Sequence, residues 1–368
     1  MASTVVGLDI GRTAVRAVEL RGKNPTLRRH GSIELGRGAV ETGVVADPHQ
    51  VTAACRELWR AGRFSTREVR LGVSSGSVLV RQIELDWMPP ADLKRALRYQ
   101  VAELLPVAVD DANLDHVLLG EVTRRDESGQ ERRMVRILLV ATARGAVDEM
   151  VRAVRAAGLR ARTADLAPLA LVRAAAAASR REALAQAAAE GRPGQLPPPR
   201  TEAVIDVGSD KVAVAVHTAG VPHFVRVAAG LGGDGLTHTL VAATGMEWDQ
   251  AERLKREAAI EHEATLRHAT TRLVNEIRAT LDFYSDSDAE HVVGSVAVTG
   301  AGAAHPSFLD TCSRTLGLPV RPLTLSSVVD GATTPPGGRG RGKGTDDATE
   351  RPSDAYVVPA ALCLGAIA

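Results

Sequence analysis

Two segments of the chain carry the same pattern, and this repeat limits the fold more than any other feature. Residues 5–20 contain a β-branched run that ends in an Asp-x-Gly turn at Asp9, followed by a second apolar run. Residues 203–216 repeat the pattern around Asp206. Each segment predicts a strand, a tight turn and an antiparallel return strand. Because one copy opens each half of the chain, we expect two similar lobes.

The two turns have the composition of a site for phosphate and Mg²⁺. Gly11 and Gly208 each follow the aspartate by two residues, and glycine lets turn backbone approach a ligand closely. Two such hairpins facing each other would hold phosphates on turn N–H groups, while Asp9 and Asp206 reach the water shell of the metal. A single Asp-x-Gly turn is common in proteins. Two copies in the same context favour the phosphate interpretation.

Composition excludes several classes of protein. A length of 368 residues predicts two or three domains. Lys and Arg (45) balance Asp and Glu (44), and no long basic block occurs, which argues against a nucleic-acid or membrane-surface partner. Three cysteines far apart suggest neither a disulfide framework nor a zinc site. Without a signal-like start or a run of about 18 apolar residues, a cytoplasmic protein is expected.

The order of the predicted elements indicates how the chain is divided. Three strands over 4–35, a helix from Asp47 and a strand at 69–73 predict an α/β layer, and an α-β-β-α block then interrupts it. The predicted divisions are a lobe I core at 1–81 and 163–200, an inserted α-β-β-α subdomain at 82–162, a lobe II core at 201–235 and 291–330, a helical subdomain at 236–290, a disordered loop at 331–352, and a C-terminal helix at 353–368 that returns to lobe I.

Two further stretches are candidate ligand contacts. The strand at 296–298 runs into small residues that include Gly300 and Gly302, which permit close approach to a ring system, although an ordinary strand-to-helix turn has the same composition. Glu252 and Lys255 share a helix face, usually as a solvated ion pair. In a nucleotide site the carboxylate would instead accept from ribose hydroxyls while the lysine stem packs on the base.

In this order and spacing the elements resemble the phosphate-1, phosphate-2, adenosine and ribose-contacting motifs of the actin, Hsp70 and sugar kinase superfamily. More narrowly, the chain resembles the PilM family, the FtsA-like cytoplasmic assembly proteins of type IV pilus machines. The resemblance covers nearly the whole chain and implies an α/β, actin-like ATPase fold with two duplicated lobes and an inserted subdomain. The residues that carry it are 7–11, 15–20, 103–106, Asp115, 206–208, Arg226, Gly232, Gly233, Thr237, 251–255, 276–278, 281–284 and 299–303.

The resemblance also implies ATP and Mg²⁺ between the lobes, with Asp9 and Asp206 positioning metal-bound water. The implied nucleotide contacts are Gly11, Arg12, Thr13, Gly208, Ser209 and Lys211 for the phosphates, Gly232, Gly233 and Thr237 for the phosphate or ribose end, and Glu252, Lys255, Gly300 and Gly302 for the nucleoside.

The chain departs from the family pattern at two positions. Val212 stands where a hydroxyl residue is usual, so one phosphate-facing donor is expected to be lost, and Ala301 stands where glycine is usual, so its Cβ is expected to crowd the base. Nucleotide affinity is then reduced, or binding is lost. Lys211 either replaces the lost donor as a point charge or is solvated on its turn. No third carboxylate or glutamine is placed to orient an attacking water, so we expect at most a weak ATPase or a pseudo-ATPase scaffold.

For the partner, the resemblance implies the cytoplasmic tail of a PilN-like inner-membrane protein within the pilus assembly complex. This would place the chain at the inner face of the cytoplasmic membrane, and self-association is a further possibility. The inserted subdomain would help form the groove for the tail. The candidate groove residues occur at helical spacing, which is more often a core stripe than a binding face. They are Leu93, Leu97, Val101 and Leu104.

Two other functions remain as alternatives. A small-molecule (sugar) kinase of the same superfamily needs a catalytic base beside a sugar pocket, and no sugar loop is recognisable. An FtsA-like filament former would be anchored by a C-terminal amphipathic helix. Residues 356–368 are uniformly apolar and lack the Lys/Arg face of such an anchor, which favours a buried closing helix.

Overall fold

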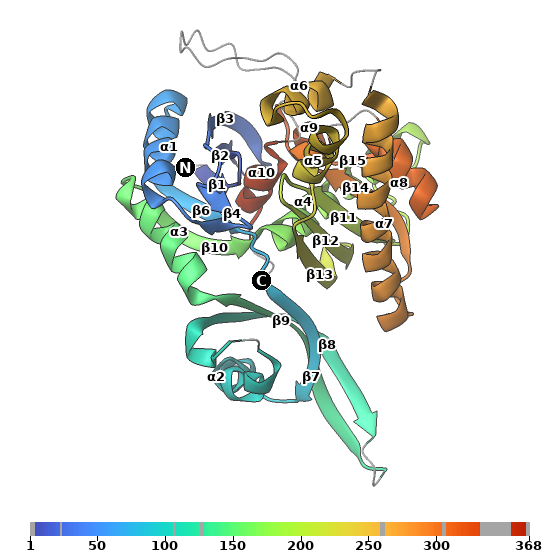
Figure 1. Cartoon of the computed structure of the whole chain (residues 1–368). Helices are drawn as coiled ribbons and strands as arrows, with labels where there is room; N and C mark the ends of the chain where they lie inside the picture. Colours follow the sequence, from blue (N-terminus) through green and yellow to red (C-terminus); the bar gives the residue numbers. More distant parts are fainter. Residues whose placement is uncertain are drawn as a thin grey trace.

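The structure, a computed structural model, describes residues 4–22, 24–105, 107–125, 129–257, 262–303, 307–331 and 355–365. Each of its two lobes is built on a five-stranded sheet, and the two sheets have the same strand order, β3-β2-β1-β6-β10 and β13-β12-β11-β14-β15 (Figure 1). In both, three antiparallel strands are followed by two that pair in parallel. The predicted duplication of the lobes is therefore confirmed.

The bounds of these strands agree with the predicted hairpins. In lobe I they are β1 (Thr4–Ile10), β2 (Ala14–Arg21), β3 (Thr26–Glu34), β6 (Glu68–Val73) and β10 (Arg160–Leu166). In lobe II they are β11 (Thr201–Val207), β12 (Lys211–Thr218), β13 (Val221–Ala229), β14 (Val293–Thr299) and β15 (Val320–Pro322). A short hairpin of β4 (Val40–Glu41) and β5 (Val44–Val45) precedes the first helix.

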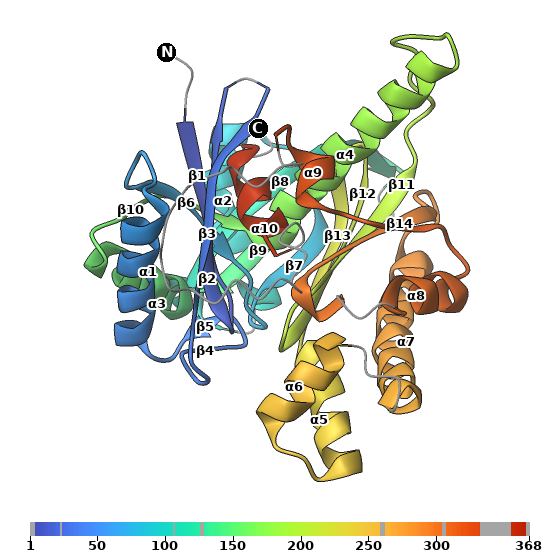
Figure 2. The same cartoon turned by 90° about the horizontal axis from the view of Figure 1, so that it is seen from above.

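Helices cover both faces of each sheet, and one set lies between the sheets (Figure 2). The outer face of lobe I is covered by α1 (Pro48–Gly62) and α3 (Arg144–Ala156). Between the sheets lie α4 (Ala167–Ala189), α9 (Leu325–Val328) and α10 (Val357–Cys363). The outer face of lobe II is covered by α5 (Gly233–Thr244), α6 (Trp248–Glu257), α7 (Glu263–Ser287) and α8 (Phe308–Leu316). This layering buries the apolar side chains of every central strand.

The start of α1 shows how a local signal fixes an element. The Asp47 side chain accepts hydrogen bonds from the backbone N–H groups of His49 and Gln50, both at 3.0 Å, and Pro48 occupies the first turn. An aspartate cap followed by proline is a favoured helix start because it satisfies otherwise unpaired N–H groups.

The inserted subdomain has an additional strand that the sequence pattern did not predict. β7 (Leu79–Asp86) pairs with β9 (Glu131–Ala143), which also pairs with β8 (Ala112–Arg125), and α2 (Pro90–Gln100) packs on this sheet. Two 3₁₀ turns, at 102–104 and 109–111, connect α2 to β8. The hairpin of β8 and β9 projects from the lower end of the molecule in Figure 1.

The predicted α-β-β-α order is present in the chain as α2, β8, β9 and α3, but its second helix packs outside the insertion. Residues 82–162 were expected to form one unit, yet α3 packs on α1 through Met150, Ala153 and Val154, which belong to the apolar core around β1. Thr52 on α1 also donates to the Ala153 carbonyl at 3.1 Å. The order within the insertion is β-α-β-β, because α3 buries its apolar face on lobe I.

The second half of the chain is described only in part. Residues 236–290, which were expected to be helical, contain most of α5 and the whole of α6 and α7. Residues 332–354 are outside the described residues, and the loop predicted at 331–352 falls almost wholly among them. Within the described ranges, none of the helices is both long and apolar enough to span a bilayer.

The C-terminal helix α10 is buried, in agreement with the closing-helix prediction. Val357, Ala360, Ala361 and Leu362 are fully buried between β1, β2 and α4. A side chain at Gly7 would place its Cβ 1.9 Å from the Pro359 carbonyl oxygen. The helix therefore lies directly on the backbone of β1.

Candidate functional site

The two Asp-x-Gly turns have the same hydrogen-bonding geometry. The backbone N–H of Gly11 donates to the carbonyl of Ala14 at 3.0 Å, and that of Gly208 donates to the carbonyl of Lys211 at 2.9 Å. Each turn closes an antiparallel hairpin whose strands pair without a register shift. The hairpins consequently deliver their aspartates to equivalent ends of the two central strands.

Asp9 and Asp206 lie close enough to influence each other across the junction of the lobes. Burial raises the pKa of Asp9, opposed by the positive charges of Arg16 and Lys211. Burial, and then the neighbouring Asp9, raise the pKa of Asp206 to about 6. Two desolvated carboxylates at one junction favour a cation beside them, since a cation relieves both burial and mutual repulsion.

Arg12 connects the lobes through two carboxylates of lobe II. Its Nε lies 2.9 Å from Asp234 Oδ2, and its Nη1 lies 3.7 Å from Asp210 Oδ2. Asp210 also accepts from the backbone N–H of Thr42 at 2.7 Å. The residue expected to contact phosphate is thus placed at the junction, paired with protein groups.

Lys211 crosses the same junction in the opposite direction. Its Nζ donates to the carbonyl oxygen of Ser74, which follows β6 in lobe I, at 2.6 Å. The sequence left open whether Lys211 faces a phosphate or is solvated on its turn. The structure adds a third arrangement, in which the ammonium bridges the lobes and contributes positive charge near both aspartates.

The glycine-rich loops pack on the backbone of the second turn. The N–H of Gly233 donates to the Gly208 carbonyl at 2.9 Å. A Cβ at Gly232 (φ 143°) or at Gly302 would come within 2.5 Å of that same carbonyl oxygen. A Cβ at Gly300 (φ 97°) would lie 2.5 Å from Asp206 Oδ1. These glycines are required because three chain segments approach one another too closely for any side chain.

Thr237, Glu252 and Lys255 form one partly buried cluster. Lys255 Nζ donates to Glu252 Oε1 at 2.6 Å, to Thr237 Oγ1 at 2.8 Å and to the Gly233 carbonyl at 3.1 Å. Thr237 also hydrogen-bonds to Glu252. The lysine therefore ties α6 to the start of α5, beside the glycine-rich loop.

The remaining candidate residues lie on the turns themselves. The Ser209 carbonyl accepts from Asp234 N–H at 2.8 Å, and the Thr13 carbonyl accepts from Leu35 N–H at 2.8 Å. Thr13 and Ala301 are exposed. The effect of Ala301 on a bound base stays a prediction.

Two buried hydroxyl groups at the junction fit a polar ligand. Ser74 Oγ and Thr299 Oγ1 have no hydrogen-bond partner among the described residues. Thr299 pairs with Asp206 in the register of β11 and β14, and the Ser74 carbonyl accepts from Lys211. A buried hydroxyl without a partner is costly, so both are suited to phosphate oxygens or metal-bound water.

Sequence reasoning missed Arg16 and Asp234 at this junction. Arg16 lies opposite Asp9 in the register of β1 and β2, and a strand pairing drawn from the hairpin would have found it. Asp234 is an acidic residue in the first turn of α5, directly after the paired glycines. Because acidic residues are favoured in the first turn of a helix, this residue could have been recognised from the sequence.

The candidate groove residues are placed differently from the expectation. Leu93, Leu97 and Val101 pack on β9 within the subdomain and are buried, whereas Leu104 is exposed. A stripe at helical spacing buries itself on the nearest sheet, which here belongs to the same subdomain. The first three side chains therefore do not line an open groove.

Comparison with known proteins assigns the family. Residues 7–330 match the family described as type IV pilus assembly protein PilM. The chain belongs to the PilM family. It is thus a PilM-like type IV pilus assembly protein with a mixed α/β, actin-like ATPase fold of two lobes.

Solved structures similar to this PilM-family chain include one described as the PilM–PilN type IV pilus biogenesis complex. That match has 23% identity and a TM-score of 0.77, and it covers 98% of this chain and 97% of the other. The ethanolamine utilization protein EutJ from Carboxydothermus hydrogenoformans matches at 16% identity, with a TM-score of 0.56 and coverage of 98% and 89%. MreB5 of Spiroplasma citri, bound to ADP, matches at 11% identity, with a TM-score of 0.46 and coverage of 87% and 91%.

Proposed function

We propose that this PilM-family protein is a nucleotide-responsive scaffold of a type IV pilus machine. It would bind ATP and Mg²⁺ between its lobes. On its surface it would bind the cytoplasmic tail of a PilN-like membrane protein. The proposal of nucleotide binding rests on Asp9 and Asp206, which the two duplicated turns place at one junction. The two unpartnered hydroxyls beside them support the same ligand.

The contacts of Arg12 and Lys211 suggest how binding would change the shape of the protein. Both cations hold the lobes together through protein acceptors, Asp210 and Asp234 for Arg12 and the Ser74 carbonyl for Lys211. Bound ATP with Mg²⁺ would supply competing anionic oxygens and a cation for the aspartates. Exchange of these partners would then couple occupancy to the angle between the lobes.

Hydrolysis is not required for this function, and we propose that it is slow. Asp210 and Asp234, the further carboxylates at the junction, are both engaged by Arg12. An engaged carboxylate is poorly placed to orient an attacking water. The same arrangement weighs against a sugar kinase, which needs a free base beside its substrate.

Calorimetric titration with ATP and Mg²⁺ tests the proposal of nucleotide binding. Saturable binding by the parent is expected, with at least tenfold weaker binding by Asp9→Ala and Asp206→Ala. Asp249→Ala, an exposed position on α6, is the control and should bind like the parent. Absence of heat in the parent, or equal binding by all variants, would contradict a site at the paired turns.

For the tail of the partner, we propose a surface at the end of α2. Tyr99, Leu104 and Val107 are all exposed apolar side chains within one short stretch of the inserted subdomain. Exposed aromatic and aliphatic side chains close together in the sequence are candidates for a peptide-binding face. The similarity to the PilM–PilN complex supports a PilN-like occupant. The membrane partner would hold the protein at the inner face of the cytoplasmic membrane.

Binding of a fluorescent peptide, made from the cytoplasmic tail of a PilN-like protein, tests the surface. Leu104→Glu should weaken binding at least tenfold. Leu118→Glu changes another exposed leucine of the same subdomain, on β8, and should leave binding unchanged. Equal affinities of the two correctly folded variants would place the tail elsewhere.

A further inference from the structure

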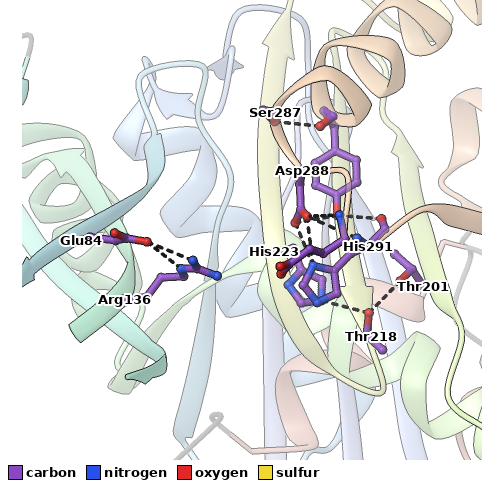
Figure 3. Close-up of polar contacts among 10 residues, drawn as sticks. Glu84, Arg136, Thr201, Thr218, His223, Ser287, Asp288 and His291 are labelled. Atoms are coloured by element: carbon purple, nitrogen blue, oxygen red, sulfur yellow. Dashed lines mark hydrogen bonds and ion pairs between the residues drawn. The ribbon is translucent and has the colours of Figure 1, made fainter. Parts of the chain in front are cut away.

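A second cluster of polar side chains lies at the far end of the lobe II sheet (Figure 3). His223 is on β13, while Asp288 and His291 follow the C-terminal end of α7. In the register of β12 and β13, His223 lies near Thr218, seven residues along β12 from Lys211. At about 3.3 Å per residue, this places the cluster roughly 23 Å from the paired turns. It is a different site from the lobe junction.

The three side chains converge with the spacing of metal ligands. Each offers one ligand atom, and the three atoms lie within 4.8 Å of one another. Among the residues that the structure describes, no other three His, Cys, Asp or Glu side chains meet this spacing. The imidazole rings of His223 and His291 stack with centroids 3.8 Å apart and an angle of 22°. The ligand atoms thus come from two elements far apart in sequence.

Neighbouring groups hold each of the three side chains in place. The Asp288 carboxylate lies 3.0 and 3.1 Å from His291 Nδ1, and it accepts from the backbone N–H of Glu290 at 3.1 Å. Tyr284 Oη lies 3.2 Å from the same carboxylate. Ligands fixed in advance lose little freedom when an ion binds.

His223 has the outer hydrogen bond that is typical of a metal-binding histidine. Its Nε2 lies 2.9 Å from Thr218 Oγ1, which lies 2.8 Å from Thr201 Oγ1. When Nε2 donates to the hydroxyl, Nδ1 keeps its lone pair. A nitrogen with a free lone pair is what a metal ion requires of an imidazole.

We propose that His223, Asp288 and His291 form a binding site for a divalent transition-metal ion, best suited to Zn²⁺. Two nitrogens and one carboxylate oxygen are a common zinc donor set, and bonds of about 2.0–2.2 Å in tetrahedral geometry bring ligand atoms about 3.4 Å apart. Small rotations of the partly exposed His291 and Asp288 side chains would close the observed spacing. Water would fill the fourth position.

The bound ion would fasten the end of α7 to the edge strand β13. Its occupancy would be independent of nucleotide at the junction. The same ion would set the position of the loop that leads from α7 into β14.

Zinc titration of the chelator-stripped full chain, followed by calorimetry, tests the site, and Co²⁺ provides a visible spectrum that reports tetrahedral geometry. The parent should bind one equivalent of Zn²⁺ and show a higher melting temperature with Zn²⁺ than with chelator. His223→Ala and His291→Gln should lose both effects, and Thr218→Val should weaken binding about tenfold through the outer hydrogen bond. His268→Ala, an exposed histidine of α7, should behave like the parent.

The two ligand variants make the test robust to folding defects. His291 is partly exposed and glutamine is similar in size, so His291→Gln should keep the fold if His223→Ala does not. Binding by a folded His291→Gln variant with parent affinity would overturn the site. Weak binding of several ions without saturation in the parent would also overturn it and would identify the cluster as a hydrogen-bonded histidine pair.

Discussion

Replacement of Asp206 by asparagine should stabilise the protein at neutral pH. Burial and the neighbouring Asp9 raise the pKa of this carboxyl group from 3.8 to about 6. The folded state therefore binds the proton more tightly than the unfolded state does, so stability is greatest when the group is protonated and falls as the pH rises from 3.8 through 6. Asparagine is neutral throughout and avoids this loss.

The shift in the pKa of Asp206 sets the expected gain in the free energy of unfolding. A rise of about two pKa units corresponds to about 3 kcal/mol at about 1.36 kcal/mol per unit, which is the expected gain of Asp206→Asn at pH 7.5. At pH 4.5 the parent group is largely protonated when folded and partly protonated when unfolded. The linkage relation then leaves a gain of only about 1 kcal/mol.

Urea unfolding of the nucleotide-free protein at pH 7.5 and pH 4.5 measures both gains. Asp249→Asn, on the exposed face of α6, is the matched control and should change stability by less than about 0.5 kcal/mol at either pH. An Asp206→Asn variant less stable than the parent at pH 7.5, or a gain that is equal at both pH values, would refute the desolvation of this carboxylate.

Three further variants test the packing and the junction. Gly7→Ala should lose about 1–3 kcal/mol or more in urea unfolding, because its methyl group would overlap the Pro359 carbonyl; parent stability would contradict the close approach of α10. Leu97→Ala should lose about 2–5 kcal/mol while exposed Leu104→Ala loses less than about 0.5, and equal losses would contradict the buried stripe. Arg12→Ala leaves two lobe II carboxylates without their lobe I cation and should increase the radius of gyration in X-ray scattering, whereas an unchanged radius would assign the lobe contact elsewhere.

The elements predicted best from the sequence are those whose signals are local. The two hairpins follow from alternating β-branched runs and a glycine two residues after Asp9 and Asp206. The start of α1 follows from Asp47 and the proline after it. Each of these signals specifies a backbone conformation within a few residues, without reference to distant parts of the chain.

The elements that the sequence predicted poorly depend on which surfaces meet. The apolar face of α3 is visible in the pattern, but nothing local says that it packs on α1 and not on the adjacent β9. The stripe of Leu93, Leu97 and Val101 has the same ambiguity between a groove and a core. Periodicity shows that one face of a helix is buried. The surface on which that face packs is set by tertiary contacts.

The candidate site shows the same limit. Its glycines and aspartates were found because turns require particular residue types. The partners of Arg12 and Lys211 were missed, because a long flexible cation can reach any acceptor within several ångströms of its turn. Their contacts with Asp234 and Ser74 emerge only when the lobes are assembled.

The position of α10 has a consequence for the synthesis of the chain. Cys363 at its end donates to the carbonyl of Val5, a contact between residues 358 positions apart. At about 5–20 residues per second, a ribosome needs roughly 20 to 70 s to make that span. During this time α10 does not yet cover its face of β1 and β2, so the nascent chain exposes an aggregation-prone apolar surface. The first lobe to be translated is therefore among the last parts to be completed, and a chaperone that shields this surface would raise the yield of folded protein.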